Sequence, residues 1–180
     1  MVFTSSEGQA ATIAERVATE FGQLGLAAEV AEADLAPARL DAYDVVVLGG
    51  SIHVGRHQKA LEAFAKAHHD ELNRRPSAFF SVSLTAVNPD EEHQATARKL
   101  ADEFLAATEW TPDAVAVFGG ALKYRRYNVV KRFILRRIAR KEGGDTDTSR
   151  DWEYTDWEAV RSFAQTVASL AGEVRAKSTA

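Results

Sequence analysis

The chain has 180 residues, of which 46% are hydrophobic and 27% are charged, which is ordinary for a soluble globular protein with one buried core. It contains no cysteine, which excludes disulfides, thiol nucleophiles and thiolate-bound iron–sulfur clusters. Redox chemistry would then reside on an organic cofactor or a non-thiolate metal. We expect no secretory signal and no membrane-spanning helix, since no apolar run approaches the roughly 18 residues that a span needs.

The net charge of −4 is unevenly distributed. Nine basic residues and no acid lie between Lys123 and Lys141, whereas the rest of the chain holds 13 basic and 26 acidic residues. A basic segment within an acidic body is typical of a protein that meets one particular anionic partner.

Short apolar runs alternate with helical periods along the whole chain. Continuous β-branched residues indicate strands buried on both faces, Gly25 is expected to end the first helix, and Thr155 with Glu158 reads as a capping box that opens the last helix. In chain order, strands are predicted over 1–3, 26–33, 44–50, 76–83 and 114–120, and helices over 10–24, 58–72, 91–108 and 155–171.

Repeated strand–helix units with buried strands predict an α/β fold, a doubly wound sheet of five parallel strands with helices on both faces. We expect a single domain over 1–180, with 123–150 as a basic helical insertion and loop before the last helix. Ligands of such sheets bind at the carboxyl ends of the strands where the strand order reverses. The loops after the first, third and fourth strands are therefore the candidates.

The first of these loops, residues 4–9, carries hydroxyl groups and leads directly into a helix. Unpaired amides and the helix dipole at such a junction favour an anion. The patterns G-x-x-x-x-G-K-[ST] and G-x-G-x-x-G are absent, so a monophosphate fits better than a di- or triphosphate. The alternative is that these hydroxyls only cap the helix.

The other two loops combine small residues with apolar side chains. Glycines in 49–55 allow a close approach of the backbone, and the apolar side chains there could cover a ring. Residues 83–88 again mix backbone donors with small apolar groups. A plain strand-to-helix turn is the alternative for 49–55.

Taken in order, these segments resemble the menaquinone-dependent protoporphyrinogen IX dehydrogenase family of the flavodoxin superfamily. The resemblance covers Thr4 to about Leu170 and implies a flavodoxin-like fold with non-covalent FMN. It further implies oxidation of protoporphyrinogen IX, a step of haem biosynthesis, with menaquinone or another membrane quinone as acceptor. Ala10 stands where the family has a threonine. The segments that carry the resemblance are TSSEGQ, DVVVLGGSIHVG, RRPSAFFSVSL, FGGALKYRRY, GGDTDT and YTDWE.

The resemblance places the flavin phosphate on residues 5–9 and the flavin ring against Ser51 and the 83–87 loop. No catalytic side chain is identified, because in flavin enzymes the cofactor carries the electrons while the protein binds and tunes it. The implied cofactor-binding residues are Thr4, Ser5, Ser6, Glu7, Gly8, Gln9, Ser51, Ile52, Ser83, Leu84, Thr85, Ala86 and Val87.

Within the basic segment, apolar and arginine side chains recur at helical spacing. Such a helix is typical of a membrane-surface element, which predicts a protein bound peripherally to the cytoplasmic face of an anionic membrane. The alternative is a helix packed on the body of the protein. Nucleic-acid binding is disfavoured by the acidic remainder of the chain. The candidate membrane- or substrate-binding residues are Arg125, Arg126, Lys131, Arg132, Arg136, Arg137 and Arg140.

Two other groups of residues are candidates for a metal site or for contact with the flavin. His53 and His57 lie four residues apart, but a third ligand at fixed spacing is missing, so no metal site is predicted. Trp152, Tyr154 and Trp157 are expected to anchor the returning chain by packing, with flavin stacking as the alternative.

Three rival functions remain open at this point. A flavodoxin-type electron carrier usually presents an acidic docking face, which the basic segment opposes. A different quinone-linked flavin reductase would share the same scaffold. A cofactor-free receiver needs clustered acids at the strand ends, where this chain has glycine and serine. The sequence does not indicate the oligomeric state.

Overall fold

Five parallel strands form the centre of the computed structural model, which describes residues 1–37, 39–122, 124, 137, 140 and 145–178. Their spatial order, β2-β1-β3-β5-β6, is that of a flavodoxin-like doubly wound sheet, as predicted. The strands are β1 (Val2–Thr4), β2 (Ala31–Glu32), β3 (Val46–His53), β5 (Ser77–Ser83) and β6 (Ala114–Gly119).

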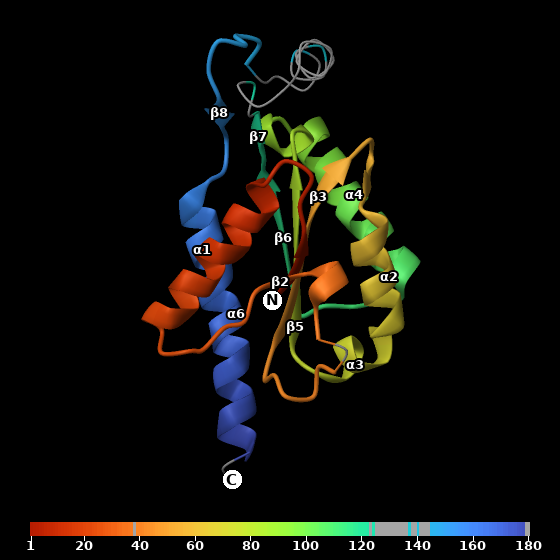
Figure 1. Ribbon diagram of the computed structural model, residues 1–180, viewed down its shortest axis with the longest axis vertical. Coiled ribbons are helices and arrows are strands. Elements are labelled where there is room, and N and C mark those ends of the chain that lie inside the picture. Colours follow the sequence, from red (N-terminus) through yellow and green to blue (C-terminus); the bar gives the residue numbers. More distant parts are fainter. Residues whose placement is uncertain (38, 123, 125–136, 138–139, 141–144, 179–180) are drawn as a thin grey trace.

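Helices cover both faces of this sheet (Figure 1). One face carries α1 (Gln9–Gln23) and α6 (Trp157–Ser178). The other carries α2 (Lys59–Ala67), α3 (His69–Arg74) and α4 (Glu91–Thr108). No helix of the described ranges is both long and apolar enough to cross a membrane.

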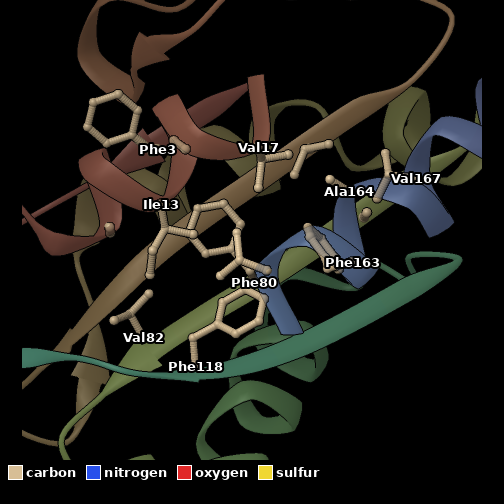
Figure 2. Close-up of a cluster of buried hydrophobic side chains, with 14 of the residues drawn as sticks. Phe3, Ile13, Val17, Phe80, Val82, Phe118, Phe163, Ala164 and Val167 are labelled. Carbon is tan, nitrogen blue, oxygen red and sulfur yellow. The ribbon is translucent and has the colours of Figure 1, made fainter. Parts of the chain in front are cut away.

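The sheet separates two apolar cores. On the side of α1 and α6, Ile13, Val17, Phe80 and Phe163 are buried together (Figure 2). The helical spacing of Ile13 and Val17 turns one stripe of α1 onto the sheet. On the opposite side, residues of α2 and α4 pack against β3 and β5 around Phe79.

A β-hairpin replaces the turn expected over 49–55. Strand β3 runs on to His53, turns at Val54 and Gly55, and pairs with the short strand β4 (Arg56–His57) in antiparallel register. The prediction that β3 ends at Gly50 was wrong, because the residues after Gly50 gain ladder hydrogen bonds from β4.

Two other predicted elements are shorter than expected. The strand expected over 26–33 is reduced to Ala31–Glu32, because its neighbour β1 offers only two residues for pairing. The helix expected over 58–72 is divided at His68, whose φ of −116° and ψ of 13° end α2. Leu72 stays buried on the same side as α2, so the apolar pattern alone does not reveal the break.

The predicted capping box at the start of the last helix was also wrong. The Asp156 carboxylate caps α6, since its Oδ1 accepts from the amides of Glu158 at 2.9 Å and Ala159 at 3.1 Å. The Thr155 hydroxyl instead donates to the Gly119 carbonyl at 2.8 Å. The helix also extends to Ser178, beyond the expected end near residue 171.

A small antiparallel pair, β7 (Ala121–Leu122) with β8 (Trp152–Glu153), stands at the carboxyl end of β6. Next to it, the Tyr124 hydroxyl donates to the Asp145 carbonyl at 2.9 Å, and the Tyr154 hydroxyl bonds both the amide and the carboxylate of Asp145. These bonds form the tyrosine clamp, which joins the chain at Tyr124 to the chain at Asp145 and Tyr154.

The clamp and the returning chain also account for the aromatic residues weighed above. Trp152 and Tyr154 pack against Leu122 and Tyr124, and Trp157 packs against the core beneath α1 and α6. Packing is therefore confirmed for all three.

Most of the basic candidates lie outside the described residues. Of the two that are described, Arg137 and Arg140 are both exposed. Those outside are Arg125, Arg126, Lys131, Arg132 and Arg136.

Gly49 gives a test of the packing beneath the site. A Cβ at this position would lie 1.9 Å from the ring of buried Phe80, so Gly49→Ala overpacks the core. We expect a loss of about 1–3 kcal/mol in the free energy of unfolding, measured by urea denaturation. Gly22→Ala is the control, because no described atom lies within 4 Å of its added Cβ and a helical alanine is favourable. Equal stability of Gly49→Ala and the wild type would contradict the packing.

Candidate functional site

The candidate site lies at the carboxyl end of β1, beside the residues of the neighbouring strand β3 that pair with it. Thr4, the last residue of β1, pairs with Gly50 of β3. The loop 4–9 then enters α1 through Gly8, whose φ of +85° is the left-handed conformation that glycine adopts without strain. This is the reversal of strand order at which ligands bind in such sheets.

The amino terminus of α1 offers free backbone donors. The first helical bond runs from Thr12 to the Gly8 carbonyl, so the amides of the preceding turn have no acceptor within the helix. In the described part of the chain no side chain caps α1, whereas aspartates cap α4 and α6. Unpaired amides at the positive end of a helix dipole suit an anion.

Two hydroxyls of the same loop are buried without partners. Thr4 Oγ1 and Ser5 Oγ form no hydrogen bond with any described residue. An unsatisfied buried hydroxyl costs about 1–3 kcal/mol. Hydroxyl donors beside free amides fit a phosphate ester, so the residues present match the cofactor that the sequence implies.

The second loop is bonded to the first. The Ser6 amide donates to Ser51 Oγ at 3.2 Å, and Gln58 Nε2 donates to Ser6 Oγ at 2.9 Å. Ile52 follows on β3 and is half-buried. The structure thus brings the loop 4–9 and the end of β3 together, and Gln58, which the sequence analysis missed, joins them.

The third loop forms a 3₁₀ turn, η2 (Thr85–Val87), directly after β5. Ser83 Oγ accepts from the Ala86 amide at 3.2 Å and fixes the turn. Leu84 packs against Leu122 and Tyr124 beside the tyrosine clamp. Since β5 is the neighbour of β3, the loop residues 83–87 lie at the same edge of the sheet as Ser51.

The side chain of Gln9, one of the residues on which the resemblance places the phosphate, is bonded to the returning chain. Its Nε2 donates to Glu153 Oε1 at 2.8 Å and to Thr155 Oγ1 at 2.9 Å, and the residue is only 5% exposed. The side chain is therefore turned to the returning chain, and only the main chain of Gln9 faces the loop. These partners are more than 140 residues away in sequence, so no local pattern could reveal them.

His57, considered above only as a possible metal ligand, is a buried polar residue. Its Nε2 lies 3.0 Å from Ser81 Oγ, its Nδ1 has no hydrogen-bond partner among the described residues, and its ring packs on Phe79 and Phe104. Burial lowers the pKa of His57 to about 4. His53 is exposed, and the described residues contain no group of three metal-ligating side chains.

Comparison with known proteins shows the family to which this chain belongs. The sequence model of the flavodoxin domain family matches residues 1–149. Protoporphyrinogen IX dehydrogenase [quinone] of Escherichia coli (strain K12) is 40% identical over 171 residues, which cover 94% of each chain. The chain belongs to the protoporphyrinogen IX dehydrogenase family.

Other members and the wider fold agree with this assignment. The protoporphyrinogen IX dehydrogenase [quinone] of Leishmania major is 38% identical over 172 residues, which cover 94% of this chain and 74% of that one. A solved archaeal flavodoxin superposes with a TM-score of 0.55 at 13% identity, over 97% of this chain and 96% of that one. The family resemblance read from the sequence is confirmed, the family is one of oxidoreductases, and a flavodoxin domain indicates a flavin cofactor.

His57 predicts a pH dependence of stability. Its pKa is near 6.5 in an unfolded chain and about 4 in the folded protein, so the unfolded state takes up a proton first as the pH falls. Stability contributed by the neutral imidazole is present above about pH 6.5 and is lost towards pH 4, by about 3 kcal/mol. Urea denaturation across this range measures it.

The loss should shrink in His57→Phe, which cannot titrate, and persist in the control His53→Gln, whose wild-type side chain is exposed. An unchanged pH dependence in His57→Phe would show that another group is responsible.

Proposed function

We propose that this chain is an FMN-dependent enzyme that oxidises protoporphyrinogen IX to protoporphyrin IX, a step of haem biosynthesis. Each pair of electrons and protons removed from the porphyrinogen would reduce one menaquinone, or another membrane quinone, to its quinol. The names of relatives that are 40% identical over 94% of the chain support the substrate and the quinone. The observation that supports the cofactor is the pair of buried hydroxyls of Thr4 and Ser5, which have no hydrogen-bond partner among the described residues and lie beside the start of α1, where no described side chain caps the helix.

In this proposal the loop 4–9 holds the flavin phosphate. Ser5 and Ser6 supply hydroxyls, and Glu7, Gly8 and Gln9 contribute main-chain amides at the amino end of α1. The left-handed Gly8 lets the chain turn so that these amides converge. The bound FMN would supply the electron-accepting chemistry.

The flavin ring would lie against the end of β3 and the loop after β5. Ser51 and Ile52 border one side, and the turn 83–87 borders the other. Ser83 holds that turn through its bond to the Ala86 amide, so its main chain keeps a fixed position. Fixed main-chain groups bind a cofactor without the entropy cost of ordering a loop.

We further propose one domain over 1–180 with the basic insertion at 123–150, bound peripherally to the cytoplasmic face of the membrane. Quinones reside in the bilayer, and the insertion is the strongly basic part of an otherwise acidic chain. Arg137 and Arg140, its two described arginines, are exposed to meet anionic lipid. The remaining basic candidates lie outside the described residues.

The second candidate is a flavodoxin-type electron carrier, or a reductase that passes electrons to quinone from another donor. The likeness to solved flavodoxins supports the fold that both would share. These candidates differ from the proposal in substrate, and a turnover assay distinguishes them.

Ser5→Ala tests the cofactor site. Loss of the hydroxyl should weaken FMN binding by about tenfold to a hundredfold, measured by quenching of flavin fluorescence, because one charge-assisted hydrogen bond is worth about 1.5–3 kcal/mol. The apoprotein should be as stable as the wild type or more so, since a buried unbonded hydroxyl is removed. Ser169→Ala, at an exposed position of α6, is the matched control and should bind FMN normally. If Ser5→Ala bound FMN with unaltered affinity, the proposal that this loop holds the phosphate would be wrong.

A turnover assay tests the reaction. FMN-loaded protein should convert protoporphyrinogen IX to protoporphyrin IX with menaquinone in anionic vesicles and should co-sediment with them. Changing Arg132, Arg136 and Arg140 to glutamine should reduce co-sedimentation and turnover severalfold while FMN affinity stays constant, since each basic residue contributes about 1 kcal/mol at the surface. Quinone reduction from other donors with no porphyrin formed would favour the second candidate.

A further inference from the structure

The tip of the β3–β4 hairpin has a backbone conformation that its sequence does not explain. Val54 and Gly55 form the turn, with φ of +52° and +75°. A two-residue turn with both φ values positive favours asparagine followed by glycine. Gly55 satisfies this preference, but a β-branched residue in the left-handed region is strained.

Packing does not explain the valine either. Val54 is 86% exposed, the highest value among the large apolar side chains of the described residues. The Val54 side chain neither favours the turn nor packs in the core, so it does not add to the stability of the folded chain. Strained residues cluster at ligand-binding sites, and this one belongs to the hairpin whose base is bonded to the candidate site.

A cationic side chain lies beside the exposed valine. Arg56 is paired across the hairpin with His53, and both residues are exposed. Arg56 forms no ion pair with any residue that the structure describes. Residues 49–61 contain no acid, although the whole chain has a net charge of −4. The tip therefore combines an apolar contact with a positive charge that has no protein partner in the described ranges.

The base of the hairpin is fixed to the candidate cofactor loop. Ser51 Oγ accepts from the Ser6 amide, and Gln58, just beyond β4, bonds Ser6 Oγ. The buried His57 side chain bonds Ser81 and anchors β4 to the sheet. The tip is thus held at the same edge of the sheet as the loop 4–9, at the top of Figure 1.

We propose that the hairpin tip binds the tetrapyrrole substrate, with Val54 against the apolar macrocycle and Arg56 on a propionate carboxylate. This inference rests on the function proposed above. It names residues that contact the substrate, which that proposal leaves unassigned. A porphyrinogen is a broad apolar ring system with carboxylates on one side, and the tip presents the complementary pair. The planar guanidinium of arginine binds a carboxylate through two parallel hydrogen bonds.

A binding assay tests the arginine. Protoporphyrin IX, the fluorescent product, and its dimethyl ester are titrated into FMN-loaded protein. Arg56→Gln should weaken binding of the diacid about tenfold and leave binding of the ester unchanged, because only the diacid can use the guanidinium. Arg74→Gln is the matched control, since Arg74 is exposed at the end of α3, just before β5 begins at the opposite edge. Equal losses for diacid and ester, or no loss, would overturn the carboxylate contact.

Val54→Asn tests the apolar contact and distinguishes it from a folding role. Asparagine suits the turn, so the variant should melt at a higher temperature than the wild type, yet bind both porphyrins severalfold more weakly. Unchanged FMN affinity would separate this loss from a defect of the cofactor site. A more stable variant with normal porphyrin binding would overturn the proposal.

Two outcomes separate this inference from its premise. Wild-type turnover with normal kinetics in Arg56→Gln and Val54→Asn would sink the hairpin contact and leave the proposed function standing, whereas an inactive wild type that binds no porphyrin would sink both. If the variants lose only co-sedimentation with anionic vesicles while porphyrin binding is intact, the tip contacts lipid and the proposal is wrong.

Discussion

The pairing of the three-residue strand β1 with β3 positions the whole candidate site. Val2, Phe3 and Thr4 lie opposite Leu48, Gly49 and Gly50, and the candidate cofactor loop begins at the end of this ladder. The two glycines are needed there because the Phe80 ring and Leu61 occupy the space where their side chains would lie. Close packing beneath β3 therefore fixes where the loop 4–9 meets the hairpin.

The buried side-chain groups that lack partners among the described residues gather at this edge. Thr4, Ser5 and His57 hold the buried side-chain atoms that lack partners within the described residues, and Val54 carries a strained backbone nearby. Elsewhere the same fold satisfies its buried polar groups, as in the bonds of Ser77 to Leu72 and Trp110. The two well-packed cores stabilise the sheet enough to hold these groups in place. Buried polar groups without partners reduce the stability of the folded chain, and their presence at one edge favours the binding of a ligand there.

The sequence predicted those features that repeat or that depend on neighbours in the chain. The stripe of Ile13 and Val17, the buried run 77–83 and the glycine after the first helix each have a local signal, and the parallel sheet follows from the alternation of strands and helices. The loop 4–9 was found because hydroxyls before a helix are a local pattern. Family resemblance supplied the cofactor and the substrate, which no periodicity contains.

The remaining features depend on contacts between distant residues. Gln9 bonds Glu153 and Thr155, and the Thr155 hydroxyl is already engaged by Gly119, so Asp156 caps α6 instead. A sequence pattern shows that a threonine can cap a helix, but it does not show which other group in the fold competes for its hydroxyl. Burial of His57 likewise arises from a hairpin that the sequence does not indicate, because Val54 disfavours the first position of its turn.

The tyrosine clamp has a consequence for how this scaffold can diversify. Tyr124, Asp145 and Tyr154 hold the chain before residue 125 close to the chain after residue 144, beside the pair β7 and β8. Each doubling of the length of a loop closed in this way adds only about 0.6 kcal/mol of entropy cost. Insertions and deletions between the two joined points should therefore cost the flavodoxin-like sheet little stability, so the length of this part of the chain can vary while the strands stay unchanged.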